Sequence, residues 1–111
     1  MGGRKLWIAT AAEPLGTVRI DAGAGRALRQ AGGASLLPRG VTGTSGAYQA
    51  GDLVAVIGPD GEEVARGLVN YSVEEVRRIA GAHTSELAAI LGHAPGQEEI
   101  IHRDNLVLTA D

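Results

Sequence analysis

The sequence predicts a mainly β domain, a small barrel or sandwich of short mixed strands decorated by short helices. Three observations predict it. The candidate strands are short and closely spaced, a tight turn at residues 59–61 joins two of them, and the central strands lack the crossover helices of a parallel fold. The 111 residues suffice for one modest core. With 3% aromatic residues and no phenylalanine, that core must consist of valine, isoleucine, leucine and alanine.

The first predicted strand and helix lie at residues 16–31. Residues 16–20, GTVRI, alternate apolar and polar side chains as a half-buried strand does. Asp21 stands where a helix N-cap belongs, and small apolar residues then recur at helical spacing up to position 31. We expect the pair of glycines at 32–33 to end this helix.

The next stretch combines extended segments with glycine-rich bends. Residues 35–37 and 41–42 are predicted to be extended, on either side of the Pro-Arg-Gly at 38–40. Residues 43–46, GTSG, are predicted to form a turn, because glycine permits backbone angles that other residues avoid. Trp7, ahead of the first strand, is predicted to be the largest single contribution to the core or to an interface.

A hairpin is predicted in the middle of the chain. The near-continuous apolar run at residues 53–57 indicates a buried strand, and the Pro-Asp-Gly at 59–61 suits a hairpin turn. Residues 62–70 return as the partner strand, and simple alternation would place Val64 and Leu68 on one face.

Two short helices and a last strand are predicted in the C-terminal part. Ser72 and Glu75 form a capping box at the start of a helix that ends at Gly81. A second helix is predicted from about residue 85 to residue 91, and residues 105–109, NLVLT, indicate the final strand.

Composition and motifs exclude several function classes. The net charge is −3, whereas dedicated nucleic-acid binders usually carry a basic excess. The glycines between 40 and 46 are not followed by lysine and precede a strand, so they match neither a P-loop nor a dinucleotide fingerprint. There is no cysteine, and no long apolar segment of a signal peptide or a membrane helix. These features indicate a cytoplasmic protein without a membrane partner.

No catalytic or metal-binding residue is predicted. His102, Arg103 and Asp104 echo part of a kinase catalytic loop, but the asparagine that should follow at position 109 is a threonine. We interpret them as a polar loop entering the last strand. The three histidines are nine or ten residues apart, without the spacing of a zinc site.

Residues 40–72, GVTGTSGAYQAGDLVAVIGPDGEEVARGLVNYS, resemble the central part of a PUA domain, a small pseudobarrel of mixed short strands with a helix after the first strand. More narrowly, residues 4–108 resemble the C-terminal PUA domains of the glutamate 5-kinase family. The stretches that carry this resemblance include GLVNYS at 67–72 and IHRDNLVL at 101–108. The resemblance implies one PUA-like domain over residues 4–109, with a helical pair inserted at 72–92 and residues 1–3 as a leader.

The resemblance also implies that catalysis and regulation belong to different domains. In that family ATP and glutamate are bound by an amino-acid-kinase domain that precedes the PUA domain. We therefore expect no enzyme activity and no cofactor in this chain, since ATP and Mg²⁺ would belong to the kinase domain. The expected partner is that N-terminal domain, which this one would regulate in proline biosynthesis.

The alternative that the resemblance leaves open is an RNA-binding module. Other PUA domains bind structured RNA through the loop after the first helix. The tentative RNA-binding residues here are Arg29, Arg39, Gly40 and Val41.

Overall fold

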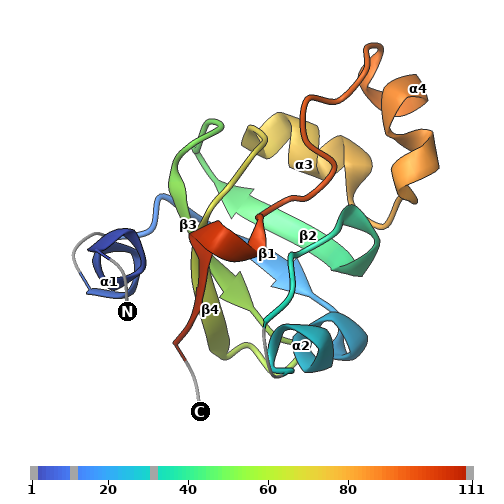
Figure 1. Cartoon of the computed structure of the whole chain (residues 1–111). Coiled ribbons are helices and arrows are strands. Elements are labelled where there is room, and N and C mark those ends of the chain that lie inside the picture. The colour runs from blue at the N-terminus through green and yellow to red at the C-terminus, as the bar shows by residue number, and fades with distance from the viewer. Residues whose placement is uncertain (1–2, 11–12, 31–32, 110–111) are drawn as a thin grey trace.

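The computed structural model describes residues 3–10, 13–30 and 33–109, and its centre is a five-stranded mixed sheet (Figure 1). The strand order is β2-β1-β3-β4-β5, with β1 parallel to β3 and the other neighbours antiparallel. The strands are β1 (Gly16–Ile20), β2 (Val41–Gly46), β3 (Leu53–Ile57), β4 (Glu63–Leu68) and β5 (Leu106–Leu108). The mainly β class predicted from the sequence is confirmed.

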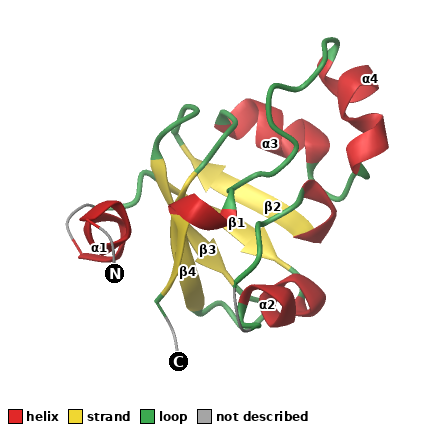
Figure 2. Ribbon diagram, viewed as in Figure 1, coloured by secondary structure: helices red, strands yellow, loops and turns green. Residues whose placement is uncertain are grey.

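Four short α-helices surround the sheet (Figure 2). They are α1 (Gly3–Thr10), α2 (Ala22–Leu28), α3 (Val73–Ile79) and α4 (Leu87–Leu91), and single 3-10 turns occupy Pro38–Gly40, Thr84–Glu86 and Arg103–Asn105. Figure 2 shows α1 on one side of the sheet and α2, α3 and α4 on the other. The capping box of α3 is present, since the Ser72 hydroxyl accepts from the Glu75 N–H and the Glu75 carboxylate accepts from the Ser72 N–H.

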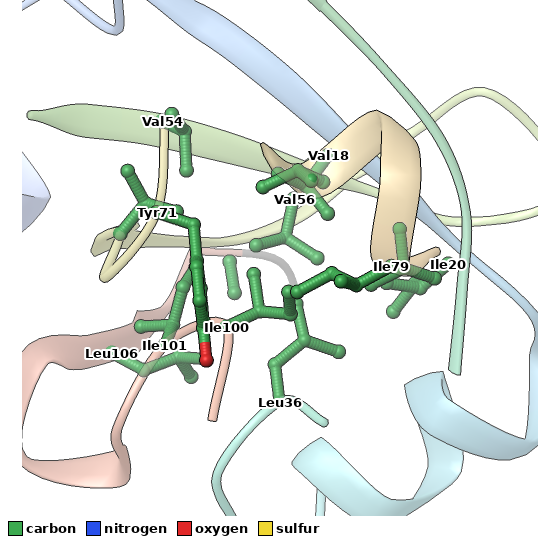
Figure 3. Close-up of a cluster of buried hydrophobic side chains, with 14 of the residues drawn as sticks. Val18, Ile20, Leu36, Val54, Val56, Tyr71, Ile79, Ile100, Ile101 and Leu106 are labelled. Atoms are coloured by element: carbon green, nitrogen blue, oxygen red, sulfur yellow. The ribbon is translucent and has the colours of Figure 1, made fainter. Parts of the chain in front are cut away.

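The main core lies between the sheet and helices α2, α3 and α4 (Figure 3). Val18 and Val56 face it from β1 and β3, and Ile79 reaches it from α3. Two loop segments complete it, because the backbone of Leu36 pairs with that of Ile101 and both side chains are buried. Branched aliphatic side chains therefore fill most of this core, as the scarcity of aromatic residues requires.

A second, smaller core lies on the opposite face of the sheet. Ile8 of α1 is fully buried there against Leu53 of β3 and Val107 of β5, with Leu68 of β4 partly buried beside them. Helix α1 contacts β4 and β5. It was not predicted from the sequence. Trp7, on the same helix, is 45% exposed and does not belong to either core.

Strand β2 corrects the prediction of a turn at residues 43–46. These residues pair with β1 in an antiparallel ladder that runs from Gly16 opposite Gly46 to Ile20 opposite Val41. The glycines serve close approach here, because a Cβ on Gly46 would lie 2.5 Å from the Cα of Gly16 on β1. The GTSG sequence, although typical of a turn, therefore forms an edge strand that lies close against β1.

A β-bulge corrects the prediction that Val64 and Leu68 share a face. Val56 pairs with Ala65 and the next residue, Ile57, pairs with Glu63, so Val64 is the extra residue in β4. The bulge reverses the alternation at this point. Val64 consequently joins the main core, whereas Leu68 packs on the second core.

Helix α2 begins as predicted but ends earlier. The Asp21 carboxylate accepts from the Ala24 N–H at 2.7 Å and caps the first turn. The N–H groups of Arg29 and Gln30 then bond to carbonyls three residues back, which tightens and closes the helix after Leu28. Gly33 has the left-handed φ of +73° expected of a glycine after a helix, and position 32 lies outside the described residues.

At Gly67 of β4, a substitution can test how tightly the main core is packed. A Cβ there would lie 2.6 Å from Ile101 Cγ2 and 2.8 Å from the carbonyl oxygen of Asn105. We expect Gly67→Ala to lower the free energy of unfolding by about 1–3 kcal/mol, since backbone and a buried side chain must move. Gly96→Ala is the control, because open space surrounds that position. Equal urea midpoints for the two variants would contradict this packing.

The two tyrosines predict alkaline sensitivity. Burial raises the pKa of Tyr48 despite its hydrogen bond with Thr44 and the positive charge of Arg77. Burial also raises the pKa of Tyr71, and the carboxylates of Glu75, Glu99 and Glu98 raise it further. Because the folded-state pKa values exceed the unfolded value of 10.0, stability from these groups is complete below pH 10 and is lost above it.

The measurement is urea unfolding at a series of pH values from neutral to strongly alkaline. Tyr48→Phe should flatten the alkaline loss, because phenylalanine does not ionise. A wild-type stability that stays constant as the pH rises past the ordinary tyrosine pKa would refute the burial argument.

Candidate functional site

A surface cleft of about 360 Å³ lies between α2 and the segment that follows it. Its lining is mostly apolar, and its polar side chains are those of Asp21, Ser35 and Arg39. The lining residues are Asp21, Gly23, Ala24, Ala27, Leu28, Ser35, Leu36, Leu37, Arg39 and Gly40. We call this hollow the α2 cleft.

Backbone hydrogen bonds fix both walls of the α2 cleft. The carbonyl of Gly40 accepts from the Asp21 N–H at 3.0 Å, which ties the far end of the loop to the start of α2. At the other end, the Leu36 N–H donates to the Ile101 carbonyl at 2.9 Å. Gly40 also allows close contact with α2, because a Cβ there would lie 2.6 Å from the Cβ of Ala24. These contacts hold the segment at residues 36–40 against α2 and the C-terminal part of the chain.

The tentative site residues occupy different positions relative to this cleft. Arg39 is exposed and lines it, and Gly40 lines it beside Arg39. Arg29 lies outside the lining, where its guanidinium is 3.8 Å from the Glu62 carboxylate. The side chain of Val41 is buried in the main core, so a ligand could meet only its backbone.

Sequence reasoning missed two further features of the α2 cleft. Asp21 was predicted only as a cap, yet it also lines the cleft and adds a negative charge to the lining that contains Arg39. Leu37 is 45% exposed beside Arg39 and offers an apolar surface. Alternation of extended residues could have signalled this exposure, because Leu36 and Leu37 must point to opposite sides.

A second cleft, of about 670 Å³, lies where α1 meets the C-terminal strand. Lys5 of α1 lines it, together with Arg103, Asp104 and Leu108. This cleft could not be predicted, since α1 itself was missed. It brings two cations and one carboxylate to an open surface.

The segment from His102 to Asp104 is the polar entry to β5 that the sequence indicated. The Asp104 N–H donates to His102 Nδ1 at 3.0 Å, and the Arg103 N–H donates to the Ser35 hydroxyl at 2.8 Å. These bonds close a 3-10 turn before Leu106. Within residues 3–10, 13–30 and 33–109, no group of three or more acidic or histidine side chains could hold a metal ion.

None of the helices in the described part of the chain is both long enough and apolar enough to cross a membrane. The arrangement is thus a small β module with surface clefts.

Comparison with known proteins assigns the module to a family. The PUA domain model matches residues 16–91, and the chain belongs to the PUA domain family. The resemblance seen in the sequence is thereby confirmed. Among solved structures, a PUA domain from Aeropyrum pernix K1 in complex with tartrate superposes with a TM-score of 0.55 at 26% identity, over 87% of this chain and 45% of that one. A chain of an archaeal box H/ACA sRNP complex gives a TM-score of 0.55 at 25% identity, over 86% of this chain and 24% of that chain.

The similar curated proteins are glutamate 5-kinases. That of Rhizobium etli is 50% identical over 107 residues, which is 96% of this chain and 27% of the relative. That of Thermosynechococcus vestitus is 52% identical over 106 residues, 96% of this chain and 28% of the relative. The chain thus spans about a quarter of the length of the kinases that it matches.

Proposed function

We propose that this chain is a non-catalytic accessory domain that adjusts the activity of a glutamate 5-kinase catalytic domain in the same protein. The observation that carries the proposal is how much of each of the two chains the similarity covers. Half of the residues are identical over 96% of this chain, yet the match occupies only 27% of the relative. The catalytic machinery, with ATP and Mg²⁺, would then reside in the remaining three quarters.

The surface described above fits a regulatory rather than a catalytic role. The α2 cleft is lined mostly by apolar residues, together with one arginine and one aspartate. No nucleophile with an adjacent base lies there, so the cleft is suited to recognition. A domain of this kind changes turnover by binding differently to two states of its catalytic partner.

Removal of the domain tests the regulatory role. The test uses the full-length glutamate 5-kinase that would contain this domain, called the longer kinase below, and its inhibition by proline, the product of the pathway. If the longer kinase is truncated before Arg4, the proline concentration for half-inhibition should change by about fivefold or more, the lower end of typical coupling between sites. Dependence on the metal ion should change with it. The control is the intact kinase at equal active-site concentration, assayed for glutamate phosphorylation. Unchanged proline inhibition and unchanged metal dependence would remove the proposal.

The second candidate function is binding of structured RNA at the α2 cleft. The observation that favours it is Arg39, an exposed arginine beside an exposed apolar side chain, Leu37, on a loop fixed at both ends. An arginine and an apolar surface together suit a phosphate and an unstacked base. The net charge of −3 and the Asp21 carboxylate in the cleft lining oppose it.

Charge reversal at the cleft tests this second function. Arg39→Glu should weaken binding to a structured RNA about tenfold or more and reduce the salt dependence by about one phosphate contact. Arg77→Glu is the matched control, because Arg77 is exposed on α3 and pairs with Glu74 instead. Filter binding or fluorescence anisotropy over a salt series gives both numbers. Wild-type protein that binds no RNA at low ionic strength would exclude the function.

A further inference from the structure

Exposed large apolar side chains mark the N-terminal flank of the domain. The described residues include four: Trp7 at 45% exposure, Leu15 at 53%, Leu37 at 45% and Leu108 at 42%. Trp7 and Leu15 precede residue 16, where the PUA match begins. Tryptophan is the residue that most often anchors protein interfaces, and its exposure here leaves a large apolar surface in water.

Both residues border the second core. Trp7 directly precedes Ile8, the side chain through which α1 packs on the sheet. The Leu15 N–H donates to the carbonyl of Leu53 at 2.9 Å, and Leu53 is the partner of Ile8 in that core. Among the described side chains, the second core consists of three buried residues and one partly buried neighbour. The exposed Trp7 lies next to Ile8 in α1, and the exposed Leu15 is held next to Leu53 by the backbone hydrogen bond, so both carry apolar surface close to this core.

Helix α1 belongs to the part that this chain shares with the kinases. The match to the Rhizobium etli enzyme covers 107 of the 111 residues, so it begins no later than residue 5. The PUA model itself leaves residues 1–15 unmatched. An eight-residue helix is marginal in water without tertiary contacts. This segment is therefore common to the kinases, lies outside the matched PUA region and carries an exposed tryptophan. These are the properties expected of a contact with the rest of such an enzyme.

We propose that Trp7 and Leu15 form the surface on which the catalytic domain of the longer chain docks. The inference rests on the proposed function, and it names the face that the accessory domain uses. The occupant is the catalytic domain, presenting an apolar patch to Trp7.

Interface size favours this occupant over a second copy of the domain. A stable interface between separate proteins buries roughly 800 Å² on each partner, far more than two side chains supply. A covalently joined domain needs much less contact, because the linker holds it at a high effective concentration. A small apolar surface at the first helix is therefore sufficient for docking within one chain.

Hydroxyl-radical footprinting with mass spectrometry tests the docking face without an activity assay. Oxidation rates of Trp7, Leu15 and Leu37 are compared between the 111-residue chain and the longer kinase. We expect Trp7 and Leu15 to react about tenfold more slowly in the longer protein, the factor that roughly 1.4 kcal/mol of docking free energy gives. Leu37, with the same exposure as Trp7, should react equally in both.

A pair of variants makes the test specific. In the longer kinase, Trp7→Ala should restore fast oxidation of Leu15, whereas Leu37→Ala should leave Leu15 protected. Equal oxidation of Trp7 in the two proteins overturns the inference, whatever truncation does to proline inhibition. Protection that already appears in the 111-residue chain as its concentration rises also overturns it, because a second copy is then the occupant. Protection of Trp7 with unchanged proline inhibition supports the docking face and refutes only the regulatory role.

Discussion

The burial of strand β3 on both of its faces is the constraint on which the rest of this structure depends. Four consecutive residues, from Leu53 to Val56, are buried. A strand with apolar side chains on both faces requires cover on both sides of the sheet. The main core with helices α2, α3 and α4 covers one face, and Ile8 of α1 covers the corner of the other. Among the described residues, the second core is much the smaller of the two.

The positions of the two surfaces proposed above follow from this arrangement. The α2 cleft lies on the main-core side, where Leu36 is paired with Ile101 and the loop is held by backbone bonds. Its lining includes few charged residues. Helix α1, which carries Trp7, lies on the opposite side of the sheet (Figure 2). An accessory domain with two separate surfaces can remain docked to its own chain through one of them and present the other to a ligand.

Local sequence signals predicted the elements whose geometry is set within a few residues. The capping box at Ser72 and the Pro-Asp-Gly hairpin at 59–61 depend only on neighbours in the chain. The errors arose where a distant residue decides the outcome. Residues 43–46 are a strand because they pair with β1, and Val64 changes face because of a bulge set by its pairing with β3. The residues that bury Ile8 of α1 are Leu53 of β3 and Val107 of β5, distant in the chain, so this helix could not be recognised from its own sequence. Of the tentative site residues, Arg39 and Gly40 line the α2 cleft, whereas the side chain of Val41 faces inward. The inward direction of Val41 was missed because the sequence alone does not fix which face of the sheet a residue takes where a strand begins.

The contact that Ile8 makes for α1 has a thermodynamic consequence. Withdrawal of one isoleucine side chain from a core costs about 1.5–3 kcal/mol, whereas complete unfolding of a domain costs roughly 5–15 kcal/mol. Loss of this contact alone would therefore leave most of the stability of the main core around β3 in place. A partner that binds α1 needs only a few kilocalories per mole of binding free energy to strengthen or to replace the contact of Ile8 with the sheet.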